Sequence, residues 1–228
     1  MTGSTITARL ARRPTTAVPT DIDVDVDIDD VIAAPTFSER HARRIDLPIE
    51  RVWPAALAVK GSEIRTLGPL SSLRGLPAKL LGRHEEREGP EPTLLDGFAG
   101  GGFVVLRRDA EPVDGRALVV MGAVGRFWHP IGNQPLRLDS GADLLSFDEP
   151  GYACAVATIE AVDRGDHTEL ITETRVRGTD RSATLRFAPY WALIRYPSGL
   201  IRRSWLAAIE RRARRPRAGD GSPRSRSG

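Results

Sequence analysis

The chain has 228 residues, of which 40% are hydrophobic and 28% charged, a composition typical of a globular protein with one domain or two very small ones. Its longest apolar run, Ala117 to Gly125, is far shorter than the roughly 20 residues of a membrane-spanning helix. The single cysteine, Cys154, excludes an intramolecular disulfide and a cysteine-rich zinc site.

The two ends of the chain have compositions typical of disorder. Residues 1–35 are rich in Thr, Pro and Arg and then in Asp, with six aspartates within residues 21–30. Acidic and apolar residues alternate there as in a strand, but repulsion among the aspartates opposes one. We therefore predict a disordered Asp-rich leader over 1–35, with an added edge strand as the alternative. Residues 216–228 are predicted to be a disordered basic tail, which leaves one folded domain over 36–215.

The distribution of charge and the first 20 residues indicate which partners and which location to expect. The formal net charge is +3, and the basic residues concentrate at residues 202–217. Such an end can attract nucleic acid or anionic lipid, but arginines in the last turns of a helix also complement its dipole, and this structural role is the favoured interpretation. No specific nucleic-acid partner is expected. The first 20 residues lack the apolar core of a secretory signal, so a cytoplasmic location is expected.

The folded part is predicted to begin with a polar strand over Phe37–Leu47, near the edge of a sheet. A short helix follows Pro48, which is tolerated at a helix start because its missing N–H would have no partner there. A second helical piece is expected within residues 69–81, interrupted by Gly75 and Pro77.

Strand signals dominate the middle of the chain. Four β-rich segments are expected, over residues 103–107, 117–124, 152–162 and 167–177. Residues 111–115 and 163–166 supply tight turns between pairs of them. Connections this short join antiparallel strands, so an antiparallel sheet is predicted.

A long C-terminal helix is predicted to close the domain. Thr179 or Asp180 can cap its start, and apolar residues recur at spacings of three or four from Phe187 to Ile209. Pro189 and Pro197 should kink this helix, and we expect a break at residues 196–199, because each proline removes a backbone hydrogen bond.

Four segments carry a resemblance to a known superfamily: FSERHARRIDLPIERVW (37–53), GAVGRFW (122–128), TETRVRGTD (172–180) and YWALIRYPSGLIRR (190–203). With the order of elements, they resemble the START/SRPBCC superfamily, which includes polyketide cyclases, and more narrowly an uncharacterised bacterial branch of it. The resemblance covers residues 37–214. It implies an α+β helix-grip fold, in which a curved antiparallel sheet wraps around a long C-terminal helix, with two short helices after the first strand. It also implies a cavity between sheet and helix, since members bind lipids, hormones or polyketides.

Alternation along two strands points to a pocket wall. Ala155 and Ala157 share one face of the strand over 152–162 with other alanines, so this face either admits the final helix closely or lines a cavity. On the next strand, Glu173 and Arg175 share a face, either as a surface ion pair or as an internal polar network. The opposite face of that strand, with Thr172 and Thr174 between apolar residues, is typical of the wall of a mixed pocket.

The aromatic residues and alanines would shape the pocket, while Arg126, Glu173 and Arg175 would orient a polar group. The complete set of predicted ligand-binding residues is Arg126, Trp128, Ala155, Ala157, Glu173, Arg175, Tyr190, Trp191 and Ile194.

Three functions remain open at this point. The first is a binding protein for a small hydrophobic or amphipathic molecule. The second is a cyclase- or dehydratase-type enzyme that uses the same cavity, with Glu173 or His129 as base. The third is contact with a partner or a membrane surface through the basic C-terminal helix. No cofactor or metal is expected, because the histidines lack ligand spacing and Gly100–Gly102 lacks the rest of a phosphate-binding loop. The sequence carries no signal for an oligomeric state.

Overall fold

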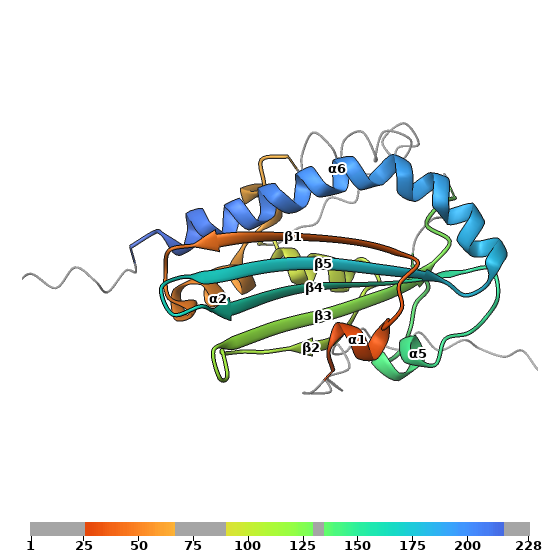
Figure 1. The fold of residues 1–228 in the computed structure, drawn as a ribbon, viewed down its shortest axis with the longest axis horizontal. Helices are drawn as coiled ribbons and strands as arrows, with labels where there is room; N and C mark the ends of the chain where they lie inside the picture. The colour runs from red at the N-terminus through yellow and green to blue at the C-terminus, as the bar shows by residue number, and fades with distance from the viewer. Residues whose placement is uncertain (1–25, 67–89, 130–134, 217–228) are drawn as a thin grey trace, which may run out of the picture.

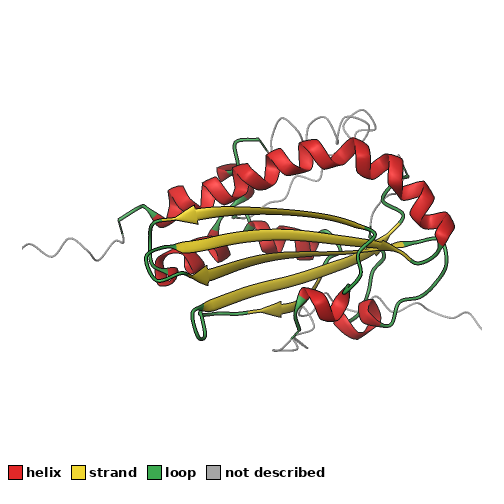
Figure 2. Cartoon of the chain, viewed as in Figure 1, coloured by secondary structure: helices red, strands yellow, loops and turns green. Residues whose placement is uncertain are grey.

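A computed structural model describes residues 26–66, 90–129 and 135–216. Five strands form one antiparallel sheet in the order β1-β5-β4-β3-β2, and the 33-residue helix α6 (Arg181–Ala213) arches across one face of it (Figures 1 and 2). The strands are β1 (Phe37–Ile45), β2 (Val104–Arg108), β3 (Arg116–Gly125), β4 (Ala153–Asp163) and β5 (Thr168–Gly178). The predicted α+β class, with a curved antiparallel sheet and a long C-terminal helix, is confirmed, and β1 lies at an edge as expected.

Two short helices follow β1, as predicted. They are α2 (Ile49–Ala58), which begins directly after Pro48, and the single 3-10 turn η1 (Gly61–Glu63). The segment 69–81, predicted to be helical, lies outside the described residues. The remaining short helices are α1 (Ile28–Val31), α4 (Leu94–Gly100) and α5 (Gly141–Leu145).

Tight turns set the register of the two hairpins. Asp114 and Gly115 both have positive φ (50° and 74°), the backbone of a type I′ turn, and they join β2 to β3. The β4–β5 turn places Gly165 at φ 86°, and its N–H donates to Asp163 Oδ1 at 2.8 Å. Both turns fall within the segments that the sequence predicted.

The long helix differs from the prediction in one respect. Asp180 caps α6, since its carboxylate accepts from the Ala183 N–H at 2.7 Å. The expected break at residues 196–199 is absent: α6 runs without interruption through Pro189 and Pro197 and curves over the sheet (Figure 1). Pro189 is exposed, so the backbone carbonyl that it leaves without a partner can be hydrated, which lets a helix bend rather than end.

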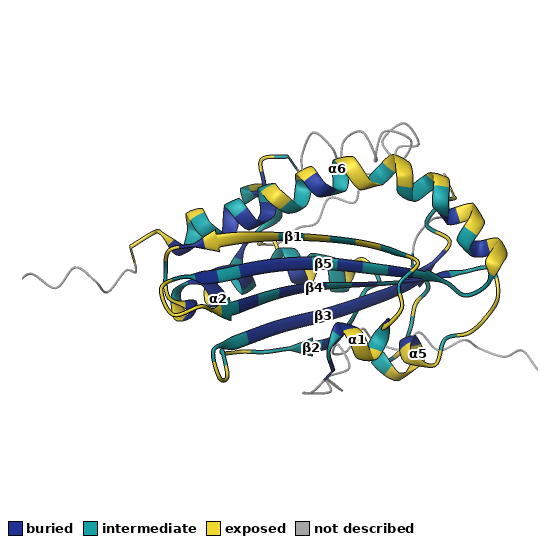
Figure 3. Cartoon of the chain, in the orientation of Figure 1, coloured by how far each residue is buried: buried dark blue, intermediate teal, exposed yellow. Residues whose placement is uncertain are grey.

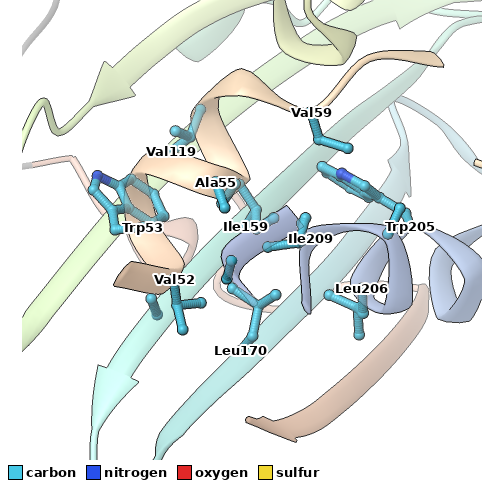
Figure 4. Close-up of a cluster of buried hydrophobic side chains, with 14 of the residues drawn as sticks. Val52, Trp53, Ala55, Val59, Val119, Ile159, Leu170, Trp205, Leu206 and Ile209 are labelled. Atoms are coloured by element: carbon cyan, nitrogen blue, oxygen red, sulfur yellow. The ribbon is translucent and has the colours of Figure 1, made fainter. Parts of the chain in front are cut away.

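Much of β3, β4 and β5 is buried (Figure 3), and buried apolar residues lie on both faces of the sheet. The face toward α6, called the inner face, packs on α2 and on the last turns of α6. Figure 4 shows this core, in which Trp53 of α2, Ile159 of β4 and Ile209 of α6 are all fully buried. The opposite, outer face is covered by α1 and α5, and its core includes Leu118, Val120 and Val156.

The boundary predicted for the leader needs correction. Residues 26–35 belong to the folded domain, because Val26, Ile28 and Ile32 are at most 7% exposed and pack on the outer face. The charge repulsion that favoured disorder is relieved by arginines: Arg116 pairs with Asp27 at 2.7 Å, and Arg175 pairs with Asp29. Residues 1–25 and 217–228 lie outside the described residues.

Candidate functional site

The inner face carries an aromatic cluster where it meets the first half of α6. The cluster comprises Phe37, Phe127, Trp128, Phe187, Tyr190 and Trp191. Five of its ring pairs involve Phe187, with centroids between 5.2 and 6.5 Å apart. Such edge-on and tilted contacts stabilise apolar packing beyond the area they bury. This cluster closes one end of the space between sheet and helix.

The middle of the inner face is less completely covered than its ends. Ala153 and Ala161 lie toward the ends of the alanine row on β4 and are fully buried, whereas Ala155 and Ala157 between them are only half-buried. These two residues belong to the central strand of the sheet, where full burial is the usual outcome. Solvent therefore reaches the centre of the face beneath α6.

Polar side chains gather beside this accessible centre. We call Glu39, His41, Thr172, Thr174, Ser198 and Arg202 the central polar cluster. Glu39 lies opposite Thr174 and His41 opposite Thr172 in the β1–β5 register, so all four point to the inner face. Ser198 and Arg202 come from α6, one helical turn apart.

Hydrogen bonds join the two sides of the cluster. His41 Nε2 lies 2.8 Å from Glu39 Oε1. Arg202 donates from Nη1 to Thr172 Oγ1 at 3.2 Å and from Nε to Ser198 Oγ at 3.3 Å. Gly199 permits this close approach, because a Cβ at that position would lie 2.7 Å from Glu39 Oε1 and 3.2 Å from His41 Nε2.

The Arg202 guanidinium is buried without a carboxylate partner. None of the ion pairs among the described residues includes it; its two hydrogen-bond acceptors are hydroxyls. Burial lowers the pKa of Arg202 below its ordinary value, and the negative charge of Glu39 only partly opposes this. An anion that reached this guanidinium would supply the part of the counter-charge that Glu39 does not.

Several buried polar atoms around Arg202 have hydrogen-bonding capacity to spare. In the part of the chain that the structure describes, Glu39 Oε2, Thr174 Oγ1 and Trp205 Nε1 are buried and have no hydrogen-bond partner. Buried polar groups are rarely left in this state, and each exception calls for an explanation. These atoms are a donor on α6 and a hydroxyl and an acceptor on the sheet.

Apolar residues continue from the polar cluster along the same face. In the sheet register, Thr174 is followed by Ala157 and then by Met121 on β3. Trp205 packs against Phe98, and Phe98 against Phe103, with centroids 6.4 and 5.4 Å apart. The region therefore has a polar end and an apolar end, which is the pattern that an amphipathic molecule requires.

An open depression of about 220 Å³ borders the cluster at the edge of the sheet. It is lined by His41, Ala42 and Arg43 of β1 and by Arg203 and Leu206 of α6. His41 is thus shared between the depression and the buried network. The depression lies where the edge strand β1 meets α6.

The structure does not bring all the predicted ligand-binding residues together. Trp128, Ala155, Tyr190 and Trp191 come together at the aromatic cluster, Ala157 lies beside the central polar cluster, and Ile194 is half-buried on α6. Arg126 is exposed and lies over the ring of Tyr152, 4.4 Å from its centroid, so it does not reach the inner face.

For Glu173 and Arg175, the predicted alternative of an internal polar network that orients a ligand is wrong. Both residues lie on the outer face, where Arg175 pairs with Glu173 at 2.6 Å and also with Asp29. It additionally donates to the Ile32 carbonyl at 3.0 Å. The pair therefore anchors α1 instead of orienting a ligand. His129, exposed after the end of β3, and Glu173 are also excluded as bases for chemistry beneath α6.

The sequence contained a signal for the polar residues that were missed. On β1, alternation puts Glu39, His41 and Arg43 on the same face as Phe37 and Ile45. A face that begins and ends with large apolar residues belongs to a core, so the polar residues between them should have been predicted as internal. For Arg202, the signal was its place one turn after Ser198 in the apolar repeat of α6.

The arginines at the end of α6 are used within the fold. Arg212 pairs with Glu63 at 2.7 Å, Arg214 with Glu210 at 2.8 Å, and Arg211 donates to the Glu63 carbonyl. This favours the structural interpretation of the basic end. Among the described residues, no group of His, Cys, Asp and Glu is arranged to hold a metal ion, and no helix is long and apolar enough to cross a membrane.

Comparisons with known proteins do not add an assignment. No protein-family model matches the chain, and no curated protein does. One similar solved structure is the hypothetical protein jhp0584 from Helicobacter pylori, with 9% identity, coverage of 87% of this chain and 100% of that chain, and a TM-score of 0.37. Another is TTHA0849 from Thermus thermophilus, with 17% identity, coverage of 77% and 96%, and a TM-score of 0.28. The likeness to the START/SRPBCC superfamily stays a prediction.

Proposed function

We propose that the protein binds a small amphipathic molecule between the sheet and α6, with an anionic group of the molecule at Arg202. The observation that carries this proposal is the buried Arg202 guanidinium, which lacks a carboxylate partner and lies beside unpartnered polar atoms and half-buried alanines. A carboxylate would accept from Arg202 in a medium where charge-assisted hydrogen bonds are strong. The expected cytoplasmic location stays a prediction.

The shape of the inner face supports the apolar part of the ligand. Ala157, Met121 and Trp205 extend from the polar cluster without a charged side chain between them. The apolar surface that an alkyl or ring system would remove from water here is the accessible part of Ala155 and Ala157, and its burial favours binding by about 25 cal/mol per Å². The aromatic cluster at the other end of the face limits the length of such a molecule.

The proposal is tested with a matched pair of fluorescent probes, a fatty acid and the corresponding fatty alcohol. The full chain should bind the acid more tightly than the alcohol. Arg202→Met should weaken binding of the acid by about 10- to 100-fold, the loss expected for a charge-assisted hydrogen bond, and leave the alcohol nearly unaffected. Arg195→Met, which changes an exposed arginine elsewhere on α6, should retain the preference. Equal affinity of the unmodified protein for both probes would contradict the proposal.

A second candidate is acid–base catalysis at the same place, and one observation favours it. His41 is oriented by Glu39 at 2.8 Å, the arrangement that positions an imidazole as a general base. Mass spectrometry of a polyketide-like ligand recovered after incubation distinguishes the two functions. Loss of water or ring closure with the natural sequence, but not with His41→Gln, would establish catalysis. An unchanged ligand in both cases would leave binding as the function.

A further inference from the structure

The side of α6 that faces away from the sheet carries a stripe of exposed apolar side chains. Leu185, Leu193 and Tyr196 are 64%, 75% and 74% exposed, Leu200 is 36% exposed, and Pro189 is exposed between them. Their spacing of three or four residues places them on one side of the helix. At a rise of 1.5 Å per residue, this apolar stripe extends for about 22 Å. Single exposed leucines are common on protein surfaces, but a continuous row marks an interaction surface.

Positive charge flanks the apolar stripe. Arg181, Arg186, Arg195 and Arg203 are exposed on the same helix, and none of them forms an ion pair with any other described residue. Between Asp180 and Glu210 the helix contains no acidic residue. This differs from the last turns of α6, where the arginines are engaged by Glu63 and Glu210. The charge available to a partner therefore lies along residues 181–203 and not at the basic end.

We propose that this side of α6 docks on the surface of an anionic lipid bilayer. A helix that lies in the membrane interface combines a row of Leu and aromatic side chains with arginines and without acidic residues. The leucines and Tyr196 would enter the boundary between headgroups and acyl chains, while the arginines would contact lipid phosphates. The residues of the stripe are exposed, and the buried residues of α6 lie on its other side, so the sheet does not obstruct contact of the stripe with a flat surface. This inference does not depend on the ligand proposed above.

The test is cosedimentation of the full chain with phosphatidylcholine vesicles prepared with and without phosphatidylglycerol. We expect binding only to the vesicles that contain the anionic lipid, and a decrease at high salt. Leu193→Glu should reduce the affinity at least about tenfold, and so should Arg195→Glu. The matched controls, Val113→Glu in the β2–β3 turn and Arg137→Glu in the loop before α5, should bind as the unmodified protein does, since both residues are exposed and neither belongs to α6.

Three results would overturn the proposal. The first is absence of binding to anionic vesicles, or equal binding to both kinds. The second is an equal loss of affinity in the control variants, which would show only a general effect of charge. The third is a dimer of the unmodified protein, seen by light scattering, that Leu193→Glu dissociates, because the stripe would then bind a second copy of the chain. Circular dichroism of each variant is the control for folding. We expect all variants to be folded, because all the changed residues are exposed.

Discussion

Arg202 occupies a position on α6 that an apolar residue could fill. The next residues toward the core, Trp205 and Leu206, are buried and pack on the sheet and α2. Burial of the Arg202 guanidinium opposes folding, because the free energy of its hydration is lost and the charge of Glu39 replaces it only in part. Groups that lower stability in this way are retained where they serve binding or catalysis. The lowered pKa of Arg202 has the same cause, because burial disfavours its charged form.

At the scale of single residues, we predict that Arg202→Met will not destabilise the protein. Methionine keeps an unbranched apolar stem and removes the charge, so the free energy of unfolding should stay unchanged or increase by up to about 2 kcal/mol. Thr172→Val is the informative partner variant. It leaves the guanidinium in place with one acceptor fewer, and should lower the free energy of unfolding by about 1 kcal/mol. Urea denaturation measures both, and a clear loss in Arg202→Met would show that the guanidinium is structural.

At the scale of elements, α1 is held on the outer face by apolar contacts and by two arginines. Ile28 and Ile32 are buried there, while Arg116 and Arg175 bind the aspartates of the segment. Burial by itself would raise the pKa of Asp27, but hydrogen bonds from Arg116 and the Ile28 N–H outweigh it and hold the pKa below the ordinary 3.8. The stabilisation from this carboxylate is therefore complete above that pH and is lost as the pH falls through the lowered pKa.

We predict that Ile32→Ala lowers the free energy of unfolding by about 2 kcal/mol, because Ile32 is only 2% exposed in the outer core. Val31→Ala, at the half-buried neighbouring position, should cost less than half as much. Thermal unfolding followed by calorimetry compares them, and hydrogen exchange over residues 28–32 should become faster in Ile32→Ala alone. Equal and negligible effects would mean that α1 contributes nothing to stability.

At the scale of the whole molecule, one sheet separates two apolar cores. Val119 and Val120 are consecutive on β3, both fully buried, and belong to the inner and the outer core respectively. The inner core joins α2 and α6 to the sheet, and the outer core joins α1 and α5 to it. Both cores pack on the same paired strands β3 and β4, so we expect them to unfold together.

Val119→Ala and Val120→Ala should therefore have similar effects. Each is expected to lower the free energy of unfolding by about 2 kcal/mol, with a single cooperative transition in calorimetry. A second, earlier transition in Val120→Ala alone would show that the outer layer unfolds independently of the rest of the domain.

Much of the architecture followed from local patterns. The strands of both hairpins and the start of α6 were predicted to within a residue or two, because alternation, turn residues and a capping aspartate act over short distances. The break at residues 196–199 was wrong, since the curvature of the sheet beneath α6 favours a bent helix over an interrupted one. Residues 26–35 were assigned to a disordered leader because their partners, Arg116 and Arg175, are remote in sequence.

The sequence by itself determined which residues share a face, and only the tertiary structure decided which face meets α6. Alternation grouped Glu173 with Arg175 and Thr172 with Thr174, as the structure has them. It could not place the first pair outside and the second inside, because both faces of β5 contain apolar residues and both are covered. The central polar cluster depends on the same choice. Glu39 and His41 become internal, and Arg202 meets Thr172, only when α6 crosses the sheet at Gly199.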